Sequence, residues 1–477
     1  MAVTRIILWL GNAFLFCAII MGLTGAAGFL LREASMSVVF LFFSLIAALL
    51  GGALVFMTRN SPSRETSKDA MIFLLLFWIF VPIVFALPYV VCGVTPTFSR
   101  AYFESVSAFS TTGASTLIAE DIPRTFLLWR SLLQWGGGVM TATFAVVILA
   151  ALNLSGSGVH RSKLFTLRRG ELFSRLIGVG RIIALIYGFI AAICFVGLLV
   201  SGTQIFESLC LSLSAISTGG LTPQNGPLSG YVSRFGVLIL AITCFFGASN
   251  VAVLWDFARL KSWRKGHKLF LNLEHRGLLV LIAALILFGL FHAGIKQFYT
   301  VLIEAIFMVS TAGFNYRPAG IETLPSALLI IIALIGGSAI STAGGLKIIR
   351  GILLLSHAGT DIDRMSHPSR VKLVRFRGQI LPDQAFLSVW MYFFGYTLVF
   401  AAGIVALGAA GMAYPVAVSA SAASLSNMGP LLPATFPLSP YAEMNGLQLG
   451  ILSSLMLFGR VEVLAAMAAF TPALWRQ

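Results

Sequence analysis

The amino-acid sequence predicts an all-α polytopic membrane protein: four helix–pore-loop–helix repeats around a pseudo-four-fold pore, plus two N-terminal transmembrane helices. Three observations predict this fold. The 477 residues are 58% apolar and only 10% charged, whereas a soluble domain carries about a quarter charged residues. The apolar residues gather in runs of roughly 20, the length that a helix needs to cross a bilayer. Between these runs, a short motif of Ser, Thr and Gly recurs.

Two apolar runs near 6–31 and 37–57 predict the N-terminal spans, within residues 1–60. Four repeats then follow, each with a long helix, a shorter semi-polar segment, a glycine-centred turn and a second long helix. We expect the repeats at 71–152, 177–257, 276–357 and 384–470. Their long helices are predicted at 71–93 and 126–152, 177–200 and 233–257, 276–295 and 326–357, and 384–410 and 445–470. Ten spans are therefore expected.

The net charge of +15 first invites a nucleic-acid partner, because basic patches attract phosphate. The basic residues, however, gather in four short polar connections, near 59–68, 161–175, 259–268 and 364–377. If each repeat enters and leaves on the same side, all four connections share one face. Positive charge kept on one face is typical of cytoplasmic loops. We therefore expect a multi-pass protein in a lipid bilayer, with both termini cytoplasmic and no nucleic-acid partner.

The recurring motif lies in segments that are too short to span the membrane. Three copies read Ser-Thr-x-Gly, at 110–113, 217–220 and 310–313, and a degenerate fourth reads Ser-Asn-Met-Gly at 426–429. Irregular backbone at membrane depth is tolerated only where protein buries it or water bathes it. Four such turns around an axis would present rings of carbonyl oxygens that replace the hydration shell of a monovalent cation. The predicted ligands are Thr111, Thr112, Gly113, Thr218, Gly219, Gly220, Thr311, Ala312, Gly313, Asn427, Met428 and Gly429.

Three acidic residues precede the turns. Glu104 and Glu304 lie nine residues before the motif glycine, and Glu207 lies thirteen before it, a difference of about one helical turn. We predict that they line an outer vestibule, where negative charge suits both the helix start and an incoming cation. The alternative for the whole motif is close packing, since Ser, Thr and Gly are common in membrane helices. Four copies on one face favour the pore.

Two further features interrupt apolar helices. Residues 336–345 carry paired glycines at both ends, Gly336, Gly337, Gly344 and Gly345, with Ser and Thr between them. We interpret this stretch as a partly unwound gate beneath the filter, with Lys347 at its cytoplasmic end; a flexible packing segment is the alternative. Arg460 falls inside the last span, where a charge costs about 2.5–3.5 kcal/mol. The alternative is a packing role through pairing with Glu462 or another acid, but Glu462 itself does not fit, because helical residues two apart do not face each other.

These residues resemble the Trk/Ktr/HKT superfamily of potassium transporters, and most closely its bacterial TrkH/TrkG type. The resemblance covers nearly the whole chain. It is carried by Trp129-Arg-Ser-Leu-Leu-Gln-Trp-Gly-Gly-Gly138, by Gly336-Gly-Ser-Ala-Ile-Ser-Thr-Ala-Gly-Gly-Leu-Lys347 and by Phe458-Gly-Arg-Val-Glu462. The two extra N-terminal spans also fit this type.

The resemblance implies one pore per subunit, K+ as the transported ion, a homodimer and a cytosolic ring of nucleotide-binding TrkA-type subunits. It implies a filter glycine from each repeat, here Gly113, Gly220, Gly313 and Gly429. A serine at the first position accompanies sodium preference in this superfamily, so four glycines favour potassium. It also favours a barrier role for Arg460 in the permeation path. The fourth turn departs from the pattern, because Asn427 and Met428 replace the Thr-x pair and Pro430 follows the glycine.

The expected function is potassium uptake across the bacterial inner membrane, through a carbonyl-lined filter gated by a cytosolic nucleotide-binding partner. Two alternatives stay open: a sodium- or proton-coupled secondary transporter, and a weakly selective potassium/sodium transporter. Inverted repeats of a secondary transporter would put successive re-entrant turns on opposite faces, whereas these four share one. The spacing of acids, histidines and cysteines supports no catalytic site, so we expect neither an enzyme nor an organic cofactor.

Overall fold

A computed structural model describes residues 2–59, 67–151, 172–258, 273–317, 324–367, 375–376, 379–380, 383–438 and 440–461. These residues are helical or in connecting turns, apart from one two-residue antiparallel pair, β1 (Arg375–Phe376) and β2 (Gln379–Ile380), with Arg375 opposite Ile380. The predicted all-α class is confirmed. Most of the basic connections, together with Glu462, Arg476 and the predicted repeat end at 470, lie outside the described residues.

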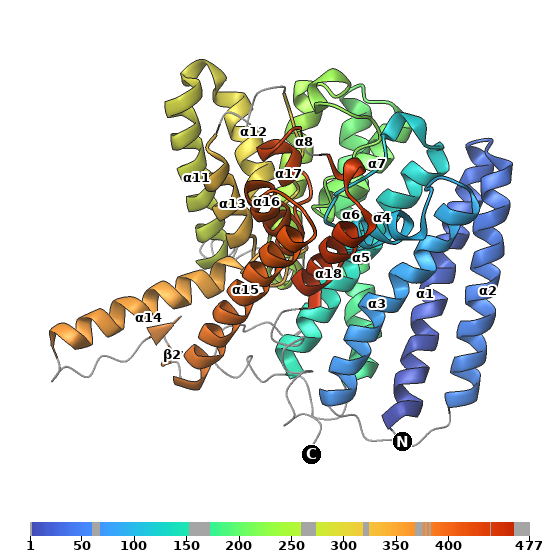
Figure 1. Cartoon of the computed structure of the whole chain (residues 1–477), viewed down its shortest axis with the longest axis horizontal. Coiled ribbons are helices and arrows are strands. Elements are labelled where there is room, and N and C mark those ends of the chain that lie inside the picture. The colour runs from blue at the N-terminus through green and yellow to red at the C-terminus, as the bar shows by residue number, and fades with distance from the viewer. Residues whose placement is uncertain are drawn as a thin grey trace.

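The helices form an N-terminal hairpin followed by four sets (Figure 1). The hairpin is α1 (Ala2–Leu30) and α2 (Ala34–Thr58). The first set is α3 (Ser67–Val91), α4 (Phe98–Phe109) and α5 (Arg124–Ala151), and the second is α6 (Leu172–Val200), α7 (Ile205–Ile216), α8 (Arg234–Ala248) and α9 (Val251–Ala258). The third is α11 (Leu273–Ala293), α12 (Phe298–Val309), α13 (Ser326–Ile335) and α14 (Ile348–Ser366), and the fourth is α15 (Asp383–Ala409), α16 (Tyr414–Leu425), α17 (Leu431–Thr435) and α18 (Gly446–Val461). Single 3₁₀ turns lie at Ala119–Asp121, Leu228–Gly230, Ile295–Gln297 and Tyr441–Glu443.

Six of the described helices are long and apolar enough to cross a membrane: α1, α2, α3, α6, α11 and α15. The chain is therefore an integral membrane protein. The second helices of two sets are broken. The predicted helix at 326–357 divides at the glycine-rich stretch into α13 and α14, as expected. The predicted helix at 233–257 also divides, into α8 and α9, because Ser249 adopts an extended backbone with ψ of 157°. This second break was not predicted from the sequence.

One chain reversal is repeated four times. Gly93, Gly202, Gly294 and Gly411 follow the ends of α3, α6, α11 and α15 by one or two residues, all with positive φ between 67° and 90°. A left-handed glycine just past a helix satisfies the last carbonyl groups and turns the chain. Gly93 N–H, for example, bonds to the carbonyl of Val90. After each reversal a helix of 12 residues begins: α4, α7, α12 or α16. We call these four the pore helices.

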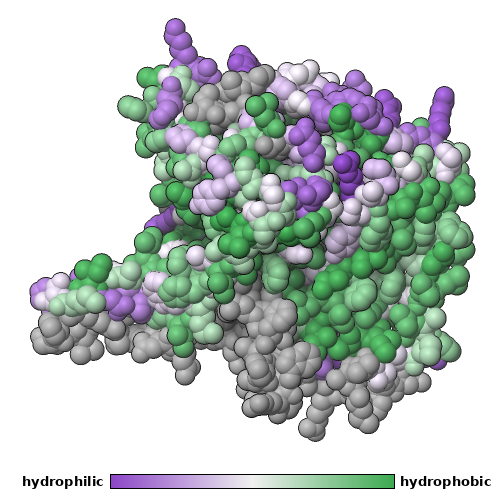
Figure 2. All heavy atoms as spheres, in the orientation of Figure 1, coloured by the Kyte–Doolittle hydropathy of each residue, from purple (hydrophilic) through white to green (hydrophobic). Residues whose placement is uncertain are grey.

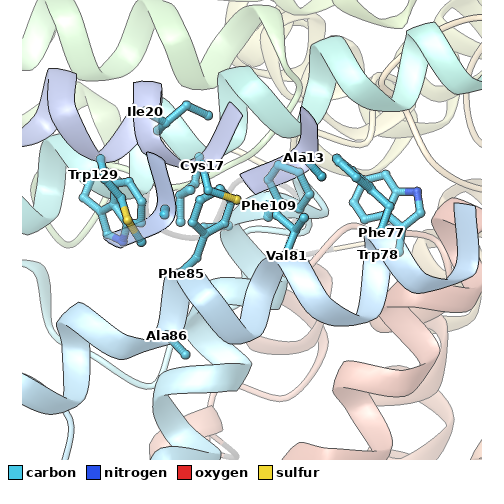
Figure 3. Close-up of a cluster of buried hydrophobic side chains, with 14 of the residues drawn as sticks. Ala13, Cys17, Ile20, Phe77, Trp78, Val81, Phe85, Ala86, Phe109 and Trp129 are labelled. Carbon is cyan, nitrogen blue, oxygen red and sulfur yellow. The ribbon is translucent and has the colours of Figure 1, made fainter. Parts of the chain in front are cut away.

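Large aromatic side chains fix the first pore helix against the N-terminal part of the chain (Figure 3). Phe109, the last residue of α4, packs against Trp78 and Phe85 of α3 at ring-centroid distances of 5.1 and 5.3 Å. Phe85 in turn contacts Trp129 of α5 at 5.2 Å. Cys17 of α1 is fully buried beside them. Burying rings of this size anchors the end of α4, and with it the turn that follows.

The outer surface matches a lipid environment. Figure 2 shows apolar side chains over the side of the molecule formed by α1, α2 and α3, and hydrophilic side chains gathered at one end. Leu45, Leu49 and Phe56 of α2 are all more than half exposed. A soluble protein rarely exposes so continuous an apolar patch, so this face is suited to contact with lipid tails.

Candidate functional site

The four motif turns share one backbone conformation. Each pore helix is followed by a serine, and the residue after that serine is left-handed: φ is 52° at Thr111, 51° at Thr218, 58° at Thr311 and 51° at Asn427. This conformation is rare for a β-branched residue. Its recurrence means that the fourth turn, although degenerate in sequence, starts like the other three.

The glycines of these turns meet in cyclic order. A methyl group at Gly113 would overlap the carbonyl oxygen of Gly219 in the second turn, and one at Gly220 would overlap that of Ala312 in the third. A methyl group at Gly313 would press on Pro430, and one at Gly429 would overlap Ala114 just after the first turn. Each turn therefore touches the next, and the fourth returns to the first. The structure brings the predicted filter residues together around one centre.

The fourth corner of this ring differs from the other three. Gly113, Gly220 and Gly313 have φ of 80°, 76° and 66° and are partly exposed. Gly429 is buried and does not have a positive φ. Its carbonyl accepts a hydrogen bond from the Tyr441 hydroxyl at 2.9 Å. The carbonyl of the fourth turn is thus already hydrogen-bonded within the protein. The departure of Asn427, Met428 and Pro430 from the motif had indicated that this turn differs.

Two other carbonyls of the ring also have protein donors. Thr112 O accepts from the backbone N–H of Gly429 at 2.6 Å. Gly219 O accepts from Nε2 of Gln134 on α5 at 2.7 Å. Gln134 is fully buried. It lies within the stretch 129–138 that carries the family resemblance, but no role was predicted for it, because only a tertiary contact reveals it.

Glycines on the second helices let them pass directly behind the turns. A methyl group at Gly137 of α5 would overlap the carbonyl oxygen of Phe109, the last residue of the first pore helix. Gly247 of α8 is placed in the same way against the end of the second pore helix, and Gly459 of α18 against that of the fourth. No role was predicted for these three residues from the sequence. The available signal was a glycine directly after an aromatic or glycine residue in each second helix.

The three acids lie inside the protein. Glu104 is 1% exposed and accepts hydrogen bonds from Ser115 Oγ and from the N–H and Oγ1 of Thr116, so it holds the segment that leaves the first turn. Glu207 is 7% and Glu304 4% exposed. All four pore helices have the same length, so the offset of Glu207 places it one turn closer to the helix start. No vestibule lined by freely exposed carboxylates is formed by these three.

The glycine-rich stretch forms a buried loop from Gly336 to Leu346, which we call the intramembrane loop. Gly336 and Gly345 have φ of 71° and 78°. A methyl group at Gly336 would overlap the carbonyl oxygen of Gly344, and one at Gly344 would overlap that of Ser426 in the fourth motif turn. The glycines thus allow the loop to close on itself and to lie against the filter turns.

Lys347 closes the loop at its other end. Its φ is 75°, which is strained for a residue with a side chain. Its Nζ donates hydrogen bonds back to the carbonyl groups of Ala343 and, at 3.5 Å, Ser341. The side chain is 9% exposed. The lysine therefore lies at the start of α14 but turns its ammonium group into the loop.

The break between α8 and α9 packs against the same loop. Val251 N–H donates to Ile340 O at 2.9 Å, and Ser338 N–H donates to Ala248 O at 3.1 Å. Glu274 of α11 joins the two: its Oε2 accepts from Nδ2 of Asn250 at 3.1 Å and from the N–H of residue 339 at 3.2 Å. The two broken helices are therefore hydrogen-bonded to each other at their breaks.

Arg460 of α18 joins the filter to the loop. It is 5% exposed, and its guanidinium donates to Ser110 O, to Thr111 Oγ1 and to Thr342 O. The first two acceptors belong to the first motif turn and the third to the intramembrane loop. Glu462, its suggested pairing partner, lies outside the described residues. The contacts of Arg460 are with oxygens of these two elements.

The proteins that this chain resembles are described as cation or potassium transport proteins. A family model described as "TrkH: Cation transport protein" matches residues 36–476. The Trk system potassium uptake protein TrkH of Salmonella typhimurium is 31% identical over 445 residues, which cover 91% of each chain, and that of Escherichia coli strain K12 is 29% identical with the same coverage. The crystal structure of the potassium transporter TrkH from Vibrio parahaemolyticus superposes with a TM-score of 0.89 at 26% identity, covering all of both chains. The matched proteins are transporters rather than enzymes, as predicted. The chain belongs to the TrkH family of cation transport proteins.

Proposed function

We propose that this protein takes up potassium across the bacterial inner membrane, and that the ion passes through the ring formed by the four motif turns. The observation that carries the proposal is the cyclic contact of these turns, with Gly113, Gly220 and Gly313 left-handed and partly exposed. Carbonyl oxygens held at such a ring can replace an ion's water. The membrane potential supplies about 2.3 kcal/mol per charge per 100 mV, which draws a cation inward.

The intramembrane loop and Arg460 form the gate in this proposal. The loop touches the fourth turn through Gly344, and Arg460 ties it to the first turn. A cation leaving the ring would meet both a buried guanidinium and a closed loop. We further propose that a cytosolic nucleotide-binding partner of the TrkA type moves this gate, that the protein is a homodimer, and that both termini are cytoplasmic. The four basic connections support this orientation.

One observation favours weaker discrimination between potassium and sodium as a second candidate. The carbonyl of Gly429 is bound by Tyr441 and the glycine is buried, so the fourth corner offers the ion a different environment from the other three. Selectivity depends on the number and geometry of coordinating carbonyls. A ring whose fourth corner differs from the others is therefore expected to be less selective than a fully symmetric one.

The proposal is tested by growth rescue. Bacteria that lack their own potassium uptake receive the intact gene or Gly113→Ser, together with a TrkA-type partner, and grow at low potassium. We expect rescue by the intact protein and loss of rescue by the variant at low but not at high potassium. Failure of the intact protein to rescue, when it is present in the membrane with its partner, refutes potassium uptake.

A further inference from the structure

The gate is hydrogen-bonded to the filter at threonines that adopt a left-handed backbone conformation. Thr111, Thr218 and Thr311 all have φ between 51° and 58°, a strained conformation for a branched side chain. Their hydroxyl groups are buried. Strain of this kind at three equivalent positions points to a function that the three side chains share.

Each of these hydroxyl groups contacts the gate. The N–H of Gly344 donates to Thr311 Oγ1 at 3.0 Å. The Thr218 hydroxyl donates to Thr342 Oγ1 at 3.1 Å, and the Thr342 hydroxyl donates onward to Gly247 O at 3.1 Å. Arg460 donates to Thr111 Oγ1. Three equivalent hydroxyl groups, one from each of three repeats, therefore form hydrogen bonds with the intramembrane loop or Arg460.

The fourth position does not take part. Asn427 shares the left-handed backbone, but its Nδ2 donates to Met456 O at 2.9 Å and to Thr112 Oγ1 at 3.0 Å. A methyl group at Gly459 of α18 would lie 2.5 Å from Asn427 Oδ1, so this oxygen faces the neighbouring helix. The ring of hydroxyl groups therefore has three members.

At two of these oxygens, the gate supplies the positive end of an N–H group. Thr311 Oγ1 faces the Gly344 amide, and Thr111 Oγ1 faces the guanidinium of Arg460, which is itself a cation. A hydroxyl oxygen has two lone pairs that accept N–H donors, and the same lone pairs can coordinate a monovalent cation. The gate donors therefore bind the same oxygen lone pairs that a bound cation would need.

We propose that the hydroxyl oxygens of Thr111, Thr218 and Thr311 form the innermost cation site of the filter, and that the closed gate competes with the cation for two of them, those of Thr111 and Thr311. The inference rests on the proposed function and adds to it a direct coupling between ion and gate. When the intramembrane loop and Arg460 withdraw, the oxygens become free for the ion. When an ion is held there, the gate loses the hydrogen bonds that keep it closed.

The test replaces one hydroxyl group and keeps the shape of the side chain. Thr311→Val retains the branch at Cβ, so the backbone cost is unchanged, whereas Thr311→Ser retains the hydroxyl. Thr24→Val is the matched control, because Thr24 is also fully buried and bonds only within α1, to Ile20 O at 3.0 Å. Initial rates of rubidium uptake are measured over a range of concentrations in potassium-uptake-deficient cells, with and without the TrkA-type partner.

Two readings are expected to change together in Thr311→Val. Uptake without the partner should rise about two- to tenfold, because the gate loses a hydrogen bond. The half-saturating concentration with the partner should rise by a similar factor, because the ion loses a ligand. Thr311→Ser should restore both values, and Thr24→Val should change neither. A change in only one of the two readings overturns the inference, since the hydroxyl then serves gate or ion alone.

Loss of the proposed function looks different. If the unaltered protein takes up no rubidium with its partner, the transport proposal fails and the competition fails with it. If Thr311→Val is missing from the membrane on an immunoblot, the same Val and Ser pair at Thr111, whose oxygen accepts from Arg460, decides the question by the same two readings.

Discussion

Gly113→Ala is the sharpest perturbation of the filter that the structure offers. The added Cβ would lie 2.1 Å from the carbonyl oxygen of Gly219. Carbon–oxygen contacts are normally about 3.3 Å or longer, so the two filter turns must separate by roughly 1.2 Å. Binding sites tolerate displacements of about 0.5 Å. We therefore expect the preference for potassium over sodium to fall at least about tenfold.

Gly93→Ala is the control for this variant. Gly93 also has a positive φ, 67°, but no heavy atom lies within 4 Å of an added Cβ. Both variants carry the same backbone strain, about 1–2 kcal/mol, and only Gly113→Ala disturbs the ring. The assay compares rubidium and sodium uptake in proteoliposomes, with thermal unfolding of the purified protein as the measure of stability. Unchanged selectivity in folded Gly113→Ala, or equal loss in Gly93→Ala, contradicts the reasoning.

Substitutions at three further positions, two of them with a comparison variant, test other parts of the site. Arg460→Gln should raise uptake without the partner several-fold, because it removes the guanidinium that connects the loop to the first filter turn. Arg460→Lys should raise uptake less. Equal uptake by the unaltered protein and both variants contradicts the barrier role. Gly247→Ala should destabilise the protein by more than 2 kcal/mol through overlap with a pore-helix carbonyl, whereas Gly450→Ala, with open space around it, should be neutral or stabilising in thermal unfolding. Tyr441→Phe frees the carbonyl of Gly429, so we expect a measurable shift in the potassium-to-sodium uptake ratio with little change in expression; an unchanged ratio shows that the fourth corner does not set selectivity.

Much of the fold could be predicted because it depends on local patterns. Long apolar runs predict spans, and the paired glycines at 336–337 and 344–345 correctly indicate a break between two helices. The break at Ser249–Asn250 could not be predicted in this way, since a single polar pair is compatible with a helix. It becomes stable only through the bonds that Val251, Ser338 and Glu274 make between distant parts of the chain.

The candidate site was predictable in its membership but not in its contacts. The motif spacing indicates which residues form the turns, and the structure brings these residues together. The motif spacing gives no signal that Gln134 contacts Gly219 or that Tyr441 contacts Gly429, because both contacts join separate segments. The burial of Glu104 was missed for the same reason: its partners, Ser115 and Thr116, lie beyond the turn.

The hydrogen-bonded pair of helix breaks has a consequence for how such a pore can evolve. A channel assembled from four identical subunits must repeat every alteration four times, so an unwound segment in one copy appears in all. Here the four copies are joined in one polypeptide, and only the second and third carry a break in the second helix among the residues that the structure describes. A helix break can therefore arise in one half of the ring without being imposed on the other half.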